Sequence, residues 1–79
     1  MPLNVAPLAR ELRNRVLART GHRLRNLNIE LSSERVILHG QAATYYVKQL
    51  AQHEVLESLP GRRLENDIEV KPDLASHVG

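Results

Sequence analysis

Residues 36–70 read VILHGQAATYYVKQLAQHEVLESLPGRRLENDIEV, and this stretch decides the fold. Its apolar start predicts a strand over residues 35–40 that ends at Gly40, where glycine is typical of a bulge or a close approach of two backbones. Thr44 is a favourable N-cap for a helix that reaches about Leu59, and Pro60-Gly61 then terminates that helix. The stretch therefore begins as a strand and continues as a helix.

The end of the same stretch alternates with a period of two, which predicts a third strand with one buried face. The inward set is Leu64, Asn66, Ile68 and Val70. Because buried amides need partners, we expect Asn66 to bond the backbone near Gly40 or Gly61. A strand, helix and strand in this order normally form a right-handed crossover, which makes the two strands parallel.

Two further elements precede this unit. Leu27, Ile29 and Leu31 alternate with polar residues, so they predict a strand that pairs with residues 35–40 as a hairpin. Apolar residues recur at helical spacing over about residues 5–20, with Asn4 as the N-cap. The sequence thus predicts an α+β fold of order αββαβ, with a three-stranded mixed sheet and both helices packed on one face.

Composition limits the chain further. With 79 residues, of which 42% are apolar and 25% charged, it suits one folded domain over residues 1–79, with a core over about 5–71 and a flexible tail at 72–79. It contains no cysteine, which excludes disulfides and zinc–thiolate sites. No apolar run is long enough to span a bilayer, and the N-terminus lacks the apolar core of a signal peptide. As written, the chain is expected in the cytoplasm, or at the cell envelope if it was cut from a longer secreted protein.

The spacing Val36-x-Leu38-x-Gly40, followed by the helix, Leu59-Pro60-Gly61 and the alternation from Leu64 to Val70, resembles the BON domain, named for bacterial osmotic-shock and nodulation proteins. The resemblance covers about residues 8–71. It implies an αββαβ fold and a non-catalytic binding module, proposed in this family to bind phospholipid or to mediate protein contacts. Arg62 stands after Gly61 where the family usually has a small aliphatic residue.

The charge is distributed unevenly. Residues 1–28 carry a net charge of +5, since six arginines accompany one glutamate, whereas residues 29–79 carry −3 from five basic and eight acidic residues. A basic N-terminal helix can attract anionic head groups, an acidic protein surface or nucleic-acid phosphates, although a solvated helix face is the plainer interpretation. The predicted contact residues are Arg10, Arg13, Arg19, Arg23 and Arg25.

Other features point away from catalysis and cofactors. The histidines have no metal-ligand spacing, and no nucleophile elbow, dinucleotide fingerprint or P-loop occurs. Tyr45 and Tyr46 open the second helix, so one is expected to pack inward and the other to be exposed. The outward sheet face collects acidic residues, which leaves open a weak cation site there.

A nucleic-acid-binding module of the KH kind is the alternative, because its type II fold also combines two helices with a three-stranded sheet. That function needs a Gly-x-x-Gly loop, which the chain lacks, and the absence of Phe and Trp removes stacking platforms. The sequence therefore predicts a binding module for an anionic membrane surface or a protein partner, with no cofactor and no metal.

Overall fold

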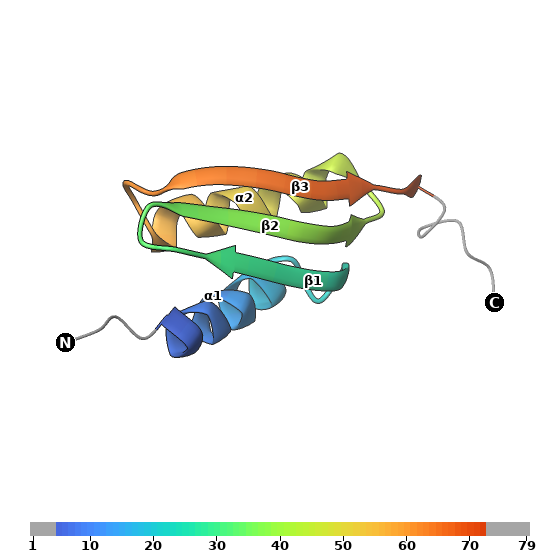
Figure 1. The fold of residues 1–79 in the computed structure, drawn as a ribbon. Helices are drawn as coiled ribbons and strands as arrows, with labels where there is room; N and C mark the ends of the chain where they lie inside the picture. The colour runs from blue at the N-terminus through green and yellow to red at the C-terminus, as the bar shows by residue number, and fades with distance from the viewer. Residues whose placement is uncertain (1–4, 73–79) are drawn as a thin grey trace.

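A computed structural model describes residues 5–72, and Asn4 and residues 73–79, on which an N-cap and most of a tail were predicted, lie outside this range. The predicted α+β fold of order αββαβ is confirmed (Figure 1). The elements are α1 (Val5–Arg19), β1 (Leu24–Leu31), β2 (Arg35–Ala42), α2 (Tyr45–Ser58) and β3 (Arg63–Val70).

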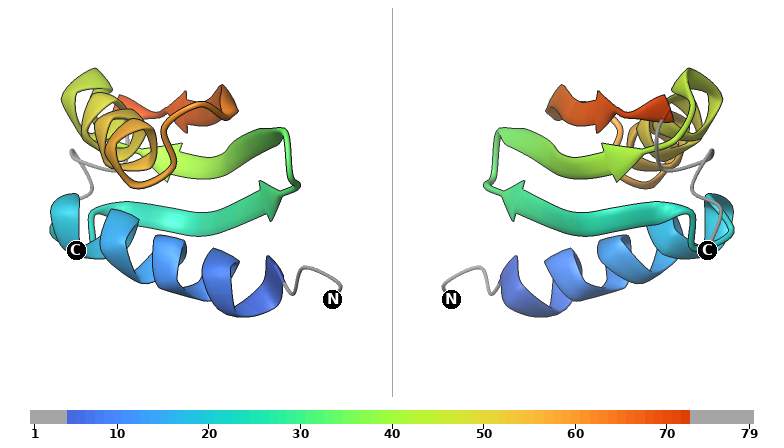
Figure 2. Two further views of the ribbon diagram at one scale, coloured as in Figure 1. Left: turned by 90° about the vertical axis from the view of Figure 1, so that its left-hand side faces the viewer. Right: turned by 90° about the vertical axis from the view of Figure 1, so that its right-hand side faces the viewer.

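The sheet has the order β1-β2-β3 and is mixed, as predicted. β1 pairs antiparallel with β2, and β2 pairs parallel with β3. Figure 2 shows α2 against one face of the sheet and α1 running alongside β1. This arrangement leaves β1 and β3 as edge strands and keeps the opposite face of the sheet open to solvent.

The core lies between the helices and the sheet and is wholly aliphatic. Leu38, Ile68 and Val55 are at most 1% exposed, and Ile29 packs against them from β1 as a partly buried residue. One row of alternating side chains from each strand therefore meets the apolar faces of both helices, as the period-two pattern predicts.

Gly40 is placed where β1 carries a bulge. Arg25 pairs with Gln41 and Asn28 with His39, so two residues of β1 lie opposite Gly40 alone. A Cβ atom on Gly40 would lie 3.0 Å from the backbone oxygen of Arg25, and its φ of 154° is rare for other residues. The predicted close backbone approach is confirmed. The prediction that the strand ends there is wrong, because the bulge lets the ladder continue to Ala42.

The connections into and out of α2 follow the local sequence. The hydroxyl oxygen of Thr44 accepts a hydrogen bond from the N–H of Val47 at 3.3 Å, which caps the helix as predicted. After α2, the N–H of Arg62 donates to the carbonyl of Leu59 at 3.4 Å around Pro60-Gly61, and Gly61 has a φ of 90°. Proline followed by a glycine of positive φ is the signature of a type II turn, so Gly61 is structural.

Candidate functional site

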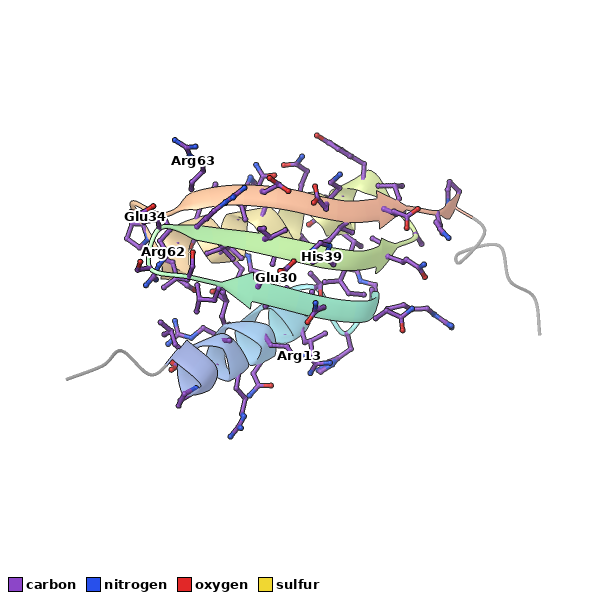
Figure 3. The ribbon with its side chains drawn as sticks, in the orientation of Figure 1. Arg13, Glu30, Glu34, His39, Arg62 and Arg63 are labelled. Atoms are coloured by element: carbon purple, nitrogen blue, oxygen red, sulfur yellow. The ribbon has the colours of Figure 1, made fainter. Side chains whose placement is uncertain are left out.

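A basic groove runs between α1 and the edge strand β1. We define the α1–β1 groove by its lining residues, which are Ala9, Arg10, Arg13, Leu27, Asn28 and Ile29, and its volume is about 350 Å³. Arg10 and Arg13 lie three residues apart on α1, so both side chains reach the same side of the helix. Figure 3 shows Arg13 beside β1. Both arginines are exposed, and neither is ion-paired with a carboxylate in residues 5–72.

Arg19, one of the predicted contact residues, does not line this groove. Its guanidinium lies 2.8 Å from Glu57 and 3.4 Å from Glu54, so it joins α1 to α2. The hydrogen bond that Arg19 donates to the Glu57 carboxylate is the largest influence on the pKa of Arg19, which is raised above its ordinary value. Arg19 is therefore a residue of the helix–helix interface.

Arg23 and Arg25 are also separate from the groove. The Nε of Arg23 donates to the backbone carbonyl of Thr20 at 2.8 Å, which ties this side chain to the end of α1. Arg25 is exposed and lies at the start of the bulge in β1. Of the five arginines predicted as a contact surface, the structure brings only Arg10 and Arg13 together in one groove.

A second basic cluster was missed by the sequence interpretation. The N–H of Arg63 donates to the carbonyl of Glu34 at 2.9 Å, and the Nε of Arg62 donates to the carbonyl of Ser33 at 3.3 Å. These bonds hold the loop before β3 against the β1–β2 hairpin, and Figure 3 shows Glu34, Arg62 and Arg63 at this end of the sheet. Arg35 on β2 is the register partner of Arg63. Arg35 is paired with Glu65 at 3.2 Å. Only the tertiary pairing of β2 with β3 brings these arginines together.

The open sheet face brings a histidine into contact with a carboxylate. His39 Nε2 lies 2.5 Å from Glu30 Oε2 across β1 and β2, and both side chains are labelled in Figure 3. Asp67 is the register partner of His39 on β3. In the part of the chain that the structure describes, no group of three or more histidine or acidic side chains is arranged to hold a metal ion.

The tyrosines contradict the prediction that one of them packs inward. Tyr45 is 63% exposed and Tyr46 is 64% exposed. The reason is their position at the first turn of α2, where the buried face begins only at Val47 and continues through Ala51 and Val55. Both aromatic rings are therefore part of the protein surface.

Asn66 faces inward as predicted, but its partners are not near Gly40 or Gly61. Its Nδ2 donates to the carbonyl of Lys48 at 3.2 Å, and its Oδ1 accepts from the N–H of Ile68 at 3.2 Å. Because α2 packs behind β3, the amide reaches the helix before it reaches either glycine. Asn66 thus fastens β3 to α2 and remains a structural residue.

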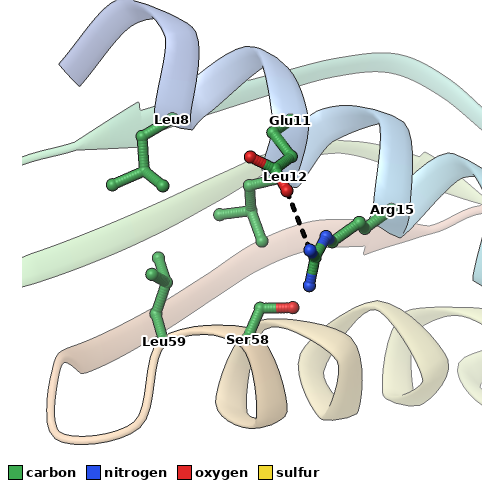
Figure 4. A pocket seen from close by; sticks show the side chains of 6 residues that line it. All are labelled: Leu8, Glu11, Leu12, Arg15, Ser58 and Leu59. Atoms are coloured by element: carbon green, nitrogen blue, oxygen red, sulfur yellow. Dashed lines mark hydrogen bonds and ion pairs between the residues drawn. The ribbon is translucent and has the colours of Figure 1, made fainter. Parts of the chain in front are cut away.

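A small hollow between the two helices is too confined for a typical ligand. Leu8, Leu12 and Leu59 form its apolar wall, and the ion pair of Glu11 with Arg15, at 2.8 Å, lies beside it (Figure 4). Its volume is about 90 Å³, whereas ligand pockets usually have about 300 to 1,000 Å³. This hollow is a packing feature of the helix pair.

Comparison with known proteins yields no matching family model, no matching curated protein and no matching solved structure. Membership of the BON family therefore stays a prediction from the residues quoted above. Within residues 5–72, none of the helices is both long and apolar enough to cross a membrane.

Proposed function

We propose that this protein is a non-catalytic, BON-like binding module that holds an acidic partner protein in the α1–β1 groove. The observation that carries the proposal is the placement of Arg10 and Arg13 over apolar walls formed by Ala9, Leu27 and Ile29. Guanidinium groups bind carboxylates with two parallel hydrogen bonds, and a less polar surrounding strengthens such bonds. The αββαβ order of the elements agrees with the fold that the BON resemblance implies.

An anionic membrane is the weaker partner on energetic grounds. A basic residue near an anionic membrane surface contributes about 1 kcal/mol. Even if Arg25 is added to Arg10 and Arg13, the attraction is about 3 kcal/mol, which is a binding constant on the order of 10² M⁻¹. A single myristoyl chain, with about 10⁴ M⁻¹, already gives only marginal anchoring. A shaped groove suits carboxylate side chains of a protein better than a plane of head groups.

Nuclear magnetic resonance titration of the whole chain with an octaglutamate peptide tests the proposal. We expect amide shifts concentrated in α1 and residues 27–29, and at least tenfold weaker binding by the double variant Arg10→Glu/Arg13→Glu. Arg62→Glu/Arg63→Glu is the matched control, because it changes the net charge equally at the hairpin end of the sheet. Binding should also weaken as salt rises, since exposed charges are screened within about 8 Å at 0.15 M.

Several outcomes would contradict the proposal. Equal losses in both double variants would show that the peptide responds only to net charge. Strong co-sedimentation with phosphatidylglycerol vesicles, together with no shift on peptide addition, would assign the groove to a membrane surface. Tight binding of oligouridylate at the groove, with none of the peptide, would favour the KH-like alternative.

A further inference from the structure

The large apolar side chains that solvent reaches within the described residues belong to α2 and to the end of β3. Tyr45, Tyr46 and Leu56 belong to α2 and are 45% exposed or more, and Val70, at the end of β3, is 38% exposed. The opposite faces of α2 and β3 already pack within the hydrophobic core. Exposed aromatic and aliphatic side chains that are grouped on a surface mark interaction sites more often than scattered ones do.

Part of this apolar set borders the open edge of β3. Tyr45, Gln49, Gln52 and Leu56 are spaced by three or four residues, so they form one stripe along α2. The side-chain amide of Asn66 on β3 lies 3.5 Å from the Oε1 of Gln52. The stripe therefore runs beside β3, on the side of α2 that faces away from α1.

β3 presents unpaired backbone groups along this edge. The N–H of Arg63 donates to Glu34, and the N–H of Lys71 donates to Ala42, so odd-numbered residues of β3 turn their backbone groups toward β2. The even-numbered residues then turn theirs outward. The side-chain Oδ1 of Asn66 accepts from the N–H of Ile68, which leaves the backbone amides of Leu64, Asn66 and Val70 directed outward along the strand.

The acidic side chains of β3 indicate which kind of partner strand could pair with its open edge. Glu65, Asp67 and Glu69 alternate with the inward residues and project onto the open sheet face along β3. Glu65 is paired with Arg35, whereas Asp67 and Glu69 have no ion pair within residues 5–72. Self-pairing of two β3 edges would oppose acidic residues, which is unfavourable. An added strand with basic residues at alternate positions would complement them.

We propose that the edge formed by β3 and the α2 stripe binds an extended segment of a second partner protein, in which basic and apolar residues alternate. The segment adds a fourth strand beside β3. Its apolar side chains cover Leu56, Tyr45 and Val70, and its basic side chains meet Asp67 and Glu69. Strand addition of this kind takes affinity from main-chain hydrogen bonds and specificity from alternate side chains. With the α1–β1 groove on the opposite edge, the module would join an acidic partner to a basic one.

Tyrosine fluorescence tests the proposal directly, because the chain has no tryptophan and Tyr45, one of its two tyrosines, belongs to the α2 stripe beside this edge. The probe is a synthetic peptide that alternates lysine and valine. We expect a saturable change in fluorescence, together with amide shifts in residues 64–70 and slower hydrogen exchange at Leu64, Asn66 and Val70. Glu65→Gln/Asp67→Gln/Glu69→Gln should weaken binding at least tenfold.

Two controls separate strand addition from general attraction. Glu11→Gln/Glu30→Gln/Glu34→Gln removes the same number of charges elsewhere and should change the affinity less than threefold. A peptide N-methylated at alternate amides keeps its charge but loses its main-chain donors, and it should not bind. The variant Arg10→Glu/Arg13→Glu should bind the lysine–valine peptide normally, so failure of the proposed function and failure of this inference are distinguishable.

Three results would overturn the inference. Binding of the N-methylated peptide equal to that of the parent peptide would exclude strand addition. Equal losses of peptide affinity in the two triple variants would show that binding depends only on net charge. Absence of any fluorescence change or amide shift with the parent peptide at millimolar concentration would show that this edge does not accept a strand of this chemistry.

Discussion

Replacing Gly40 by alanine should destabilise the protein through two effects that the structure separates. The φ of 154° is unfavourable for a residue with a Cβ atom, and that atom would also lie 3.0 Å from the carbonyl oxygen of Arg25. Backbone strain of this kind costs about 1 to 3 kcal/mol, and overpacking a tight site costs about 1 to 3 kcal/mol more. The expected loss is therefore about 2 to 6 kcal/mol.

Gly61→Ala is the matched control for this experiment. Gly61 also has a positive φ, of 90°, but nothing lies within 4 Å of an added Cβ atom. The Gly61→Ala variant should therefore lose only about 1 to 3 kcal/mol of unfolding free energy, which is the cost of backbone strain alone. A domain of 79 residues has a stability of about 4 to 12 kcal/mol, so Gly61→Ala should remain folded while Gly40→Ala approaches the unfolding limit.

Urea unfolding followed by circular dichroism measures both losses on the same scale. A spectrum of amide resonances would further show shifts in Gly40→Ala centred on residues 25–28, because the bulge must move away from the new methyl group. If Gly40→Ala were no less stable than Gly61→Ala, or if residues 25–28 kept their resonances unchanged, the bulge would not be what restricts position 40 to glycine.

The remaining predictions concern the core, the helix pair and the cap of α2. Leu38→Ala should cost about 2 to 5 kcal/mol of unfolding free energy, since Leu38 is fully buried; an unchanged melting temperature would place Leu38 outside the core. Arg19→Ala should lower the melting temperature more than Arg15→Ala does, because Arg19 bridges two helices whereas Arg15 pairs within one; equal effects in thermal unfolding would refute this. Thr44→Ala should cost about 1 kcal/mol in urea unfolding, and no loss would show that the cap contributes nothing.

The order and type of the elements were predictable because they depend on neighbours in sequence. The alternation from Leu64 to Val70 specifies a strand wherever that strand pairs, and Thr44 with Pro60-Gly61 limits α2 by local hydrogen bonds and backbone geometry. Gly40 could be identified as a position of close approach, but the bulge that causes it lies on another strand. The strand therefore continues two residues beyond the predicted end.

The candidate sites were less predictable because charge spacing along a chain does not reveal which charges neutralise one another. The five predicted arginines look equivalent in the sequence. In the folded protein Arg19 pairs with two glutamates of α2, whereas Arg10 and Arg13 line the groove beside β1. Asn66 could be placed on the inward face by its period of two, whereas its partners depended on α2 lying behind β3. Local pattern thus determined the elements and their buried faces, and the tertiary structure alone decided the surfaces that remain for partners, since those surfaces combine residues distant in the chain.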